Sequence, residues 1–123
     1  MSRADHVRVC VVGAGPTGLT TVKNLVEAGI TDIVVKPYDD TQALIARLKA
    51  PAPTKKPIVI MAHMDVVEAK ASDWAFDPFT FREENGFYLG RGVGDNKAGL
   101  VAMVSALQRL RASGFVPKRD IIV

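Results

Sequence analysis

Two short stretches of the sequence contain side chains whose types and spacing suit metal chemistry. His63-Met64-Asp65 follows the apolar run "IVIMA", and Asp95 lies further along in the glycine-rich stretch "GRGVGDNKAG". Residues i and i+2 of a strand lie on one face, so the Asp65 carboxylate can sit beside the His63 imidazole, fix its tautomer and raise its basicity as a ligand. A carboxylate such as Asp95 can bridge two metal ions. The pattern therefore predicts a metal site.

A third stretch, "VCVVGAGPTGL", suits a nucleotide. Gly13, Gly15 and Gly18 match G-x-G-x-x-G, in which the glycines allow a tight turn, close approach of the pyrophosphate and helix packing. A carboxylate about 20 residues later should bind the ribose hydroxyls. The sequence there reads "VVKPYDD", with no carboxylate until Asp39. We therefore expect neither FAD nor NAD(P) to bind tightly, and the glycines can equally serve the packing of a strand–turn–helix corner.

Periodicity indicates the elements around these residues in the first half of the chain. Strands are expected over 6–13 and 32–35, and a helix over 16–28 that Gly29 ends. Residues 41–50 are ambiguous, because their composition favours a helix whereas their alternation fits a strand. The run 58–67 is typical of a buried central strand.

The second half contains a hairpin, a helix and a strand. Asn85-Gly86 predicts a type I′ turn between two aromatic arms. A helix is expected over 96–114, with Gly114 at its end and an apolar stripe of Val101, Val104, Leu107 and Leu110. The sequence "RDIIV", residues 119–123, begins another buried strand.

Composition narrows the class of protein. The 123 residues fit one ordinary domain, and 48% hydrophobic with 24% charged residues indicates a globular chain. The net charge of +3 comes without a basic stripe, so we expect no nucleic-acid partner. Cys10, the single cysteine, is expected to be a buried, reduced thiol. The N-terminus has neither a signal-peptide core nor a membrane span, so we expect a cytoplasmic protein with no membrane partner.

Residues 61–110, "MAHMDVVEAKASDWAFDPFTFREENGFYLGRGVGDNKAGLVAMVSALQRL", resemble the aminoacylase/carboxypeptidase family of di-zinc metallopeptidases, which includes succinyl-diaminopimelate desuccinylase. The likeness extends from about Lys36 to Val123. It implies that His63 is a zinc ligand, that Asp65 is the catalytic-site carboxylate that orients it, and that Asp95 bridges both metals. It also implies a strand over 42–49 and, as substrate, a small peptide or an N-acyl amino acid.

The same resemblance implies that several parts of the machinery are absent. In the family, a Glu-Glu pair, a further carboxylate ligand and a distant histidine lie beyond the position of Val123. Glu83 and Glu84 are not substitutes, because they lie at a hairpin turn and are expected to be solvated. We therefore expect a fragment of a zinc-dependent hydrolase that is inactive as it stands.

Residues 8–30, "RVCVVGAGPTGLTTVKNLVEAGI", resemble instead the FAD-binding N-terminus of flavin-containing monooxygenases. We infer a junction near residues 25–36. The predicted fold is α/β, with a mixed sheet flanked by helices: a Rossmann-like strand–helix–strand segment over 1–35, then a truncated zinc-peptidase catalytic domain over 36–123. The alternatives are an FAD- or NAD(P)-binding module and an inert chimera. The sequence does not predict an oligomeric state.

Overall fold

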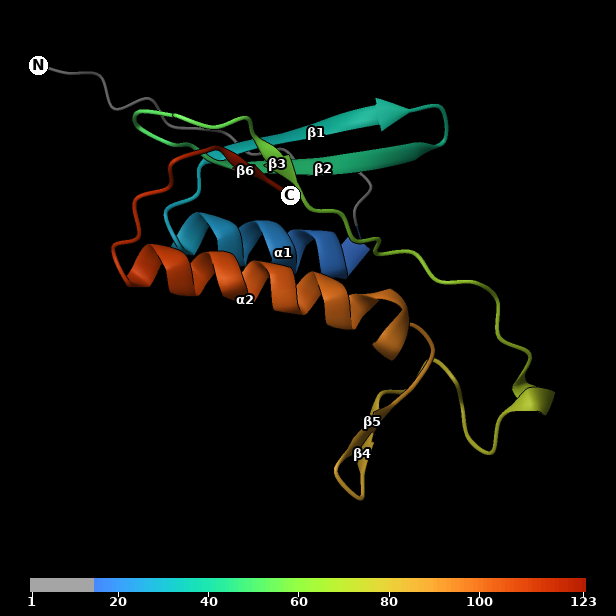
Figure 1. The fold of residues 1–123 in the computed structure, drawn as a ribbon. Helices are drawn as coiled ribbons and strands as arrows, with labels where there is room; N and C mark the ends of the chain where they lie inside the picture. Colours follow the sequence, from blue (N-terminus) through green and yellow to red (C-terminus); the bar gives the residue numbers. More distant parts are fainter. Residues whose placement is uncertain (1–14) are drawn as a thin grey trace, which may run out of the picture.

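The computed structural model describes residues 15–123, in which two helices lie along one face of a four-stranded sheet (Figure 1). A mixed α/β fold is therefore confirmed. The elements follow in the order α1 (Gly15–Glu27), β1 (Asp32–Tyr38), β2 (Thr41–Leu48), β3 (Ile58–Val59), a 3₁₀ turn η1 (Ala71–Asp73), β4 (Arg82–Glu84), β5 (Phe87–Leu89), a wide helical turn η2 (Val93–Ala98), α2 (Gly99–Ala112) and β6 (Ile121–Ile122).

The sheet has the strand order β1-β2-β6-β3 and contains both kinds of pairing. β1 and β2 are antiparallel, β6 is antiparallel to β2, and β3 is parallel to β6. The strand implied for residues 42–49 is confirmed by β2. Its alternation buries Ala46 and Leu48 while Arg47 and Lys49 stay exposed, so packing of one face outweighs the helical propensity of the segment.

α1 and α2 run side by side in the same direction, and each ends at the predicted glycine (Figure 1). Gly29 has a φ of 76°, and the N–H groups of Gly29 and Ile30 donate to the carbonyls of Val26 and Leu25. At the end of α2, Gly114 has a φ of 69°, and the N–H groups of Gly114 and Phe115 donate to the carbonyls of Arg111 and Leu110. This is the Schellman motif, in which a left-handed residue without a Cβ lets the chain turn away from the helix.

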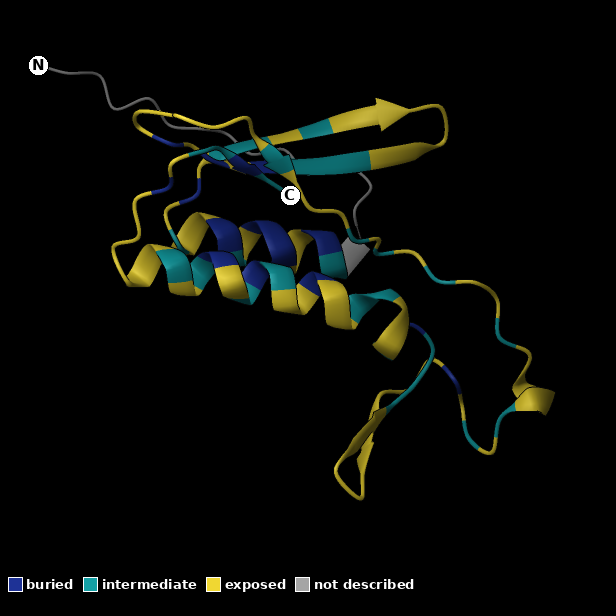
Figure 2. Cartoon of the chain, viewed as in Figure 1, coloured by how far each residue is buried: buried dark blue, intermediate teal, exposed yellow. Residues whose placement is uncertain are grey.

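The core lies between the sheet and the two helices, whose buried sides face each other and the strands (Figure 2). The predicted stripe of α2 is partly wrong, because Val101 is 63% exposed and Leu100 is buried in its place. Leu100, Val104 and Leu107 follow each other at helical spacing, and Val101 lies one residue round from that face. The core cluster comprises Leu25, Ile30, Ala46, Leu48, Leu100, Val104, Leu107 and Ile121.

The strand predicted over 58–67 is much shorter in the structure. Only Ile58 and Val59 pair with β6, and the last backbone bond runs from the Ile60 N–H to the Ile122 carbonyl at 2.9 Å. Residues 61–70 have no ladder partner among the described residues. His63 and Asp65 consequently lie on an extended loop and not on a strand face.

The hairpin of β4 and β5 projects away from the main sheet (Figure 1). Its turn residues Asn85 and Gly86 have φ values of 52° and 80°, as the predicted type I′ turn requires. Phe81 and Tyr88 stack with their ring centroids 5.5 Å apart, and both side chains are largely exposed.

The strand predicted over 6–13, with Cys10 and Gly13, lies outside the described residues. Over residues 15–123, neither helix has the length and apolar character that crossing a membrane requires. The boundary expected at residue 35 falls inside β1, and its assignment as a domain boundary stays a prediction.

Candidate metal centre

The centre of the candidate site is a pair of side chains from two loops that are far apart in sequence. His63 Nε2 lies 3.0 Å from Asp95 Oδ1. His63 is on the loop that leaves β3, and Asp95 is in η2, directly before α2. Both side chains are open to solvent, with 47% of the His63 and 90% of the Asp95 side chain exposed.

The other ring nitrogen of His63 faces Asp65. Nδ1 lies 3.1 Å from the Asp65 backbone carbonyl oxygen and 3.3 Å from its Oδ1. A neutral imidazole that donates its Nδ1–H to this carbonyl has a free lone pair on Nε2, which then points toward Asp95. The bond to the Asp65 carbonyl is the main reason why the pKa of His63 is raised above its usual 6.5. Burial opposes this shift in part, and the bond to the Asp95 carboxylate adds to it.

Lys97 connects the two loops. Its Nζ donates to the Met64 carbonyl at 3.0 Å. Because Met64 follows His63 and Lys97 lies two positions after Asp95, this bond ties the His63 loop to the Asp95 turn. Gly92 allows the loops to meet, because a Cβ at this position would collide with the Val66 side chain and come within 3.0 Å of Lys97 Nζ. The sequence alone did not indicate this role of Lys97, although Lys97 lies with Asp95 in the glycine-rich stretch "GRGVGDNKAG".

The backbone around Asp95 departs from regular helix. Gly92 is left-handed with a φ of 83°, Asp95 has φ and ψ of −113° and 99°, and the Asp95–Asn96 peptide bond is cis. α2 starts regularly at Gly99, where a Cβ would collide with the Asn96 side-chain oxygen. Asp95 therefore projects from an irregular turn whose path depends on glycine at both ends.

The segment from Trp74 to Thr80 has a structural role in the described chain. Asp77 accepts hydrogen bonds from the Phe79 N–H at 3.0 Å and from the Thr80 hydroxyl at 2.7 Å. Both bonds lower the pKa of the Asp77 carboxyl, and the bond from Thr80 has the larger effect. The Pro78 carbonyl accepts from the Arg91 N–H at 2.6 Å, and the Arg91 guanidinium lies 5.4 Å from the Trp74 ring centroid. These contacts fasten the loop that leads to Asp95.

The two donors suit zinc in type and separation. Two ligand atoms about 2.1 Å from one zinc ion in tetrahedral geometry lie about 3.4 Å apart, close to the 3.0 Å between His63 Nε2 and Asp95 Oδ1. Two donors do not complete the coordination of a metal ion. The described residues contain no group of three or more His, Cys, Asp or Glu side chains arranged to hold one. Asp65 is no third ligand of the pair, since it faces the opposite ring nitrogen.

The residues of the glycine fingerprint lie at the start of α1, as far as the structure describes them. Gly15 begins the helix and Gly18 is buried within it. Lys36 and Pro37 are exposed in β1, which pairs with its neighbour β2 in the antiparallel sense and ends in the turn containing Asp39. Cofactor binding by Gly13, Gly15 and Gly18 stays untested, and Gly13 lies outside the described residues.

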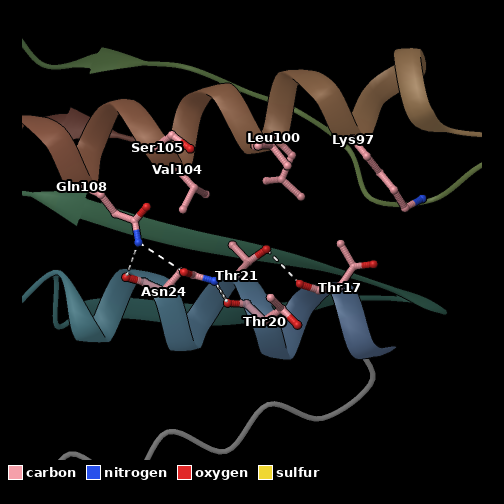
Figure 3. A pocket seen from close by; sticks show the side chains of 10 residues that line it. Thr17, Thr20, Thr21, Asn24, Lys97, Leu100, Val104, Ser105 and Gln108 are labelled. Carbon is pink, nitrogen blue, oxygen red and sulfur yellow. Dashed lines mark hydrogen bonds between the residues drawn. The ribbon is translucent and has the colours of Figure 1, made fainter. Parts of the chain in front are cut away.

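The seam between α1 and α2 contains a cavity of about 410 Å³ with several polar side chains along it (Figure 3). Gln108 Nε2 donates to the carbonyl and to the side-chain oxygen of Asn24, at 3.3 and 3.2 Å. Thr21 Oγ1 donates to the Thr17 carbonyl at 2.9 Å. The bonds between Gln108 and Asn24, which the sequence did not predict, join the flavoprotein-like helix to the helix that follows Asp95.

Comparisons with known proteins identify the family. The fold is similar to part of a peptidase, since the structure of human carnosine dipeptidase 1 superimposes with a TM-score of 0.67 at 25% identity, over 85% of this chain and 24% of that one. The family model for peptidase family M20/M25/M40 matches residues 59–123. The chain belongs to this peptidase family, as the resemblance indicated. A model of an FAD binding domain also matches, over residues 6–80, which confirms the expected likeness to two families.

Curated relatives agree with the peptidase assignment. The N-fatty-acyl-amino acid synthase/hydrolase PM20D1 of Mus musculus is 41% identical over 58% of this chain and 14% of its own length. A probable succinyl-diaminopimelate desuccinylase of Staphylococcus epidermidis is 39% identical over 72% of this chain and 21% of its own length. The chain thus spans about a fifth or less of these relatives.

Proposed function

We propose that this chain supplies part of the metal site of a zinc-dependent hydrolase of peptide or N-acyl amide bonds, with His63 and Asp95 as zinc ligands. The observation that supports it most strongly is the 3.0 Å approach of His63 Nε2 to Asp95 Oδ1, from loops 32 positions apart. Membership of a family whose proteins are generally metal-dependent supports the zinc site. Relatives named as synthases/hydrolases of N-fatty-acyl amino acids support the substrate class.

In this proposal each residue has its own task. Zinc, when bound, would supply Lewis acidity toward an amide carbonyl. His63 would offer Nε2 to the metal, and Asp95 an oxygen. Asp65 is a positioning residue, because its carbonyl accepts the Nδ1–H of His63 and thereby keeps the lone pair on Nε2. Lys97 holds the two loops at their present separation through the Met64 carbonyl.

We expect no hydrolysis by these 123 residues alone. General acid–base catalysis contributes roughly a hundred- to ten-thousand-fold to such reactions. Among the described residues, the carboxylates that contact His63 are those of Asp65 and Asp95, which have positioning and ligand roles in this proposal. Glu83 and Glu84 are exposed residues of the β4–β5 hairpin. Zinc bound by two protein donors should also be held weakly.

The test is zinc titration calorimetry on the parent chain and three variants. Weak binding is expected for the parent, with complete loss of the specific component in His63→Ala and Asp95→Ala. Glu83→Ala is the matched control, because it removes an exposed carboxylate from the hairpin and should leave the isotherm unchanged. Identical binding by the parent and His63→Ala would overturn the ligand assignment.

A further inference from the structure

Two loops that are far apart in sequence meet at the end of the molecule where both helices end (Figure 1). One loop follows β2 and contains residues 49–57, and the other follows α2 and contains residues 113–120. The N–H groups of Thr54 and Lys55 donate to the Lys118 carbonyl, at 2.9 and 3.2 Å. The two loops therefore form one surface. It lies at the opposite end of α2 from the candidate metal centre, about 20 Å away along the helix.

This surface gathers basic side chains without acidic ones. Residues 49–57 and 109–119 contain none of the 13 acidic residues of the chain. Five basic side chains lie at this end, and none of them forms an ion pair with a described residue: Lys55, Lys56, Arg111, Lys118 and Arg119. The Arg111 guanidinium donates to the Ala28 carbonyl at 3.4 Å, which keeps it beside the end of α1. The fold thus concentrates positive charge that looks scattered in the sequence.

Two acidic side chains next to this surface are already engaged. Asp120 accepts the Ala50 N–H at 2.9 Å, and its Oδ2 lies 3.8 Å from Arg47 Nη1. Asp32 Oδ2 lies 3.5 Å from Arg47 Nε and 3.2 Å from Lys49 Nζ. These carboxylates face basic side chains that are not among the five, so the five are left to attract an external anion.

Two apolar side chains are exposed on the same surface. Phe115 is 45% exposed and Val116 is 65% exposed. Both follow Gly114, whose φ of 69° turns the chain away from α2, and both precede Lys118 closely in sequence. Exposed aromatic and aliphatic side chains among Lys and Arg are typical of proteins that lie on an anionic bilayer, because the apolar groups enter the headgroup region while the cations stay at its surface.

We propose that this basic end, made up of the five basic residues with Phe115 and Val116, binds the surface of a bilayer that contains anionic phospholipids. Clusters of roughly four to eight Lys and Arg residues are typical of such contacts. Phe115 and Val116 enter the headgroup region, and the basic side chains lie over the phosphate and carboxylate groups of the lipids. We expected no membrane partner because the sequence has no spanning segment, and contact with a bilayer surface requires none.

The composition of this surface favours a bilayer over a nucleic acid. Proteins that bind single strands use several aromatic side chains on which bases stack, whereas Phe115 is the one aromatic residue in the two loops. Proteins that bind a duplex commonly place a helix or a pair of strands in a groove, and neither loop contains a helix or a strand. An acidic protein surface would also match the charge, so the test includes that chemistry.

The test is cosedimentation of the chain with vesicles at about 0.1 M salt, where charges are screened over about 10 Å. The chain should sediment with vesicles of phosphatidylserine and phosphatidylcholine in equal parts, and not with vesicles of phosphatidylcholine alone. Lys118→Glu/Arg119→Glu should weaken binding by about tenfold or more, because it reverses two charges of the basic end. Lys36→Glu/Lys70→Glu is the matched control, because it changes the net charge equally at exposed residues outside the basic end, and it should weaken binding by no more than about threefold.

The apolar contribution has its own matched pair of variants. Val116→Ser should weaken binding to the mixed vesicles, whereas Val67→Ser, at a valine that is 71% exposed on the loop after β3, should leave it unchanged. Thermal unfolding of each variant shows that it is folded.

Several outcomes would overturn the proposal: no sedimentation with the mixed vesicles, equal binding to neutral vesicles, equal loss in the two charge-reversal variants, or equal effects at Val116 and Val67. Tighter binding, per anionic group, to a DNA duplex or to polyglutamate than to the mixed vesicles would also overturn it, since the surface would then suit a nucleic acid or an acidic protein.

Discussion

The chemistry of the candidate site depends, at the scale of residues, on one imidazole ring with oxygen atoms at both nitrogens. The sequence pattern singled out His63, Asp65 and Asp95, and the structure brings the three within hydrogen-bond distance, although their roles as ligands stay predictions. The pattern did not reveal that the Asp65 backbone carbonyl is the nearer acceptor for Nδ1. That contact lies on a loop, because the segment leaves the sheet after Ile60 and before His63.

One prediction at the scale of residues concerns Asp77. The Thr80 hydroxyl, and then the Phe79 N–H, hold the pKa of the Asp77 carboxyl below its ordinary 3.8. Thr80→Val should raise this pKa toward the ordinary value, as measured by NMR titration of the carboxyl carbon. Thr41→Val removes a hydroxyl that bonds the Tyr38 carbonyl elsewhere and should leave the pKa of Asp77 unchanged. An unaltered pKa in Thr80→Val would contradict the hydrogen-bond explanation.

The direction of the pH effect follows from the same bonds. A carboxyl whose pKa is depressed in the folded state contributes stability that is fully present above its unfolded pKa. The contribution of Asp77 is therefore intact above pH 3.8 and is lost as the pH falls through the lower folded value. Thr80→Val should reduce the difference in stability between neutral and acid solution, and never increase it.

At the scale of elements, the local sequence was sufficient to predict where the helices end and where the hairpin turns. Gly29 and Gly114 end the two helices, and Asn85-Gly86 forms the hairpin turn, because each conformation depends on a few neighbouring residues. The apolar run 58–67 gave the wrong length, since a strand also needs a partner and β6 provides one only beside Ile58 and Val59. The inward face of α2 was misjudged at Val101, because the buried line of the helix runs through Leu100, Val104 and Leu107 and Val101 lies to one side of it.

The face of α2 gives a direct test of this packing. Leu107 is 3% exposed in the core, so Leu107→Ala should reduce the free energy of unfolding by about 2–5 kcal/mol. Val101 is 63% exposed, and Val101→Ala should change the free energy of unfolding by no more than about 0.5 kcal/mol. Denaturant unfolding of both variants measures the difference, and a larger loss at Val101 than at Leu107 would show that the helix faces the other way.

At the scale of the whole molecule, a flavoprotein-like helix is part of a peptidase-like core. Leu25 and Ile30 belong to the same buried cluster as Leu100 and Leu107, and Gln108 bonds to Asn24 across the helix seam. The sequence predicted a likeness to two families, but not this joint packing, because contacts between distant segments leave no local pattern. Membership of the peptidase family rests on residues 59–123, which include all three candidate metal-site residues.

The match to an FAD binding domain gives a prediction for the whole chain. We expect the purified protein to contain no flavin by absorbance and fluorescence, and added FAD to leave the melting temperature unchanged. The reason is that β1 has Lys36 and Pro37 where a ribose-binding carboxylate is needed. Gly15→Ala serves as a comparison, since a parent chain that binds FAD and a variant that does not would contradict the prediction.

The most direct test of the proposed metal pair is the state of the two ring nitrogens of His63, measured by ¹⁵N NMR with and without zinc. A His6→Gln variant leaves one histidine in the chain and removes ambiguity of assignment. The account predicts that zinc shifts Nε2 to the value of a metal-bound nitrogen while Nδ1 keeps its proton, bonded to the Asp65 carbonyl. Zinc at Nδ1, or no change at either nitrogen at saturating zinc, would contradict it.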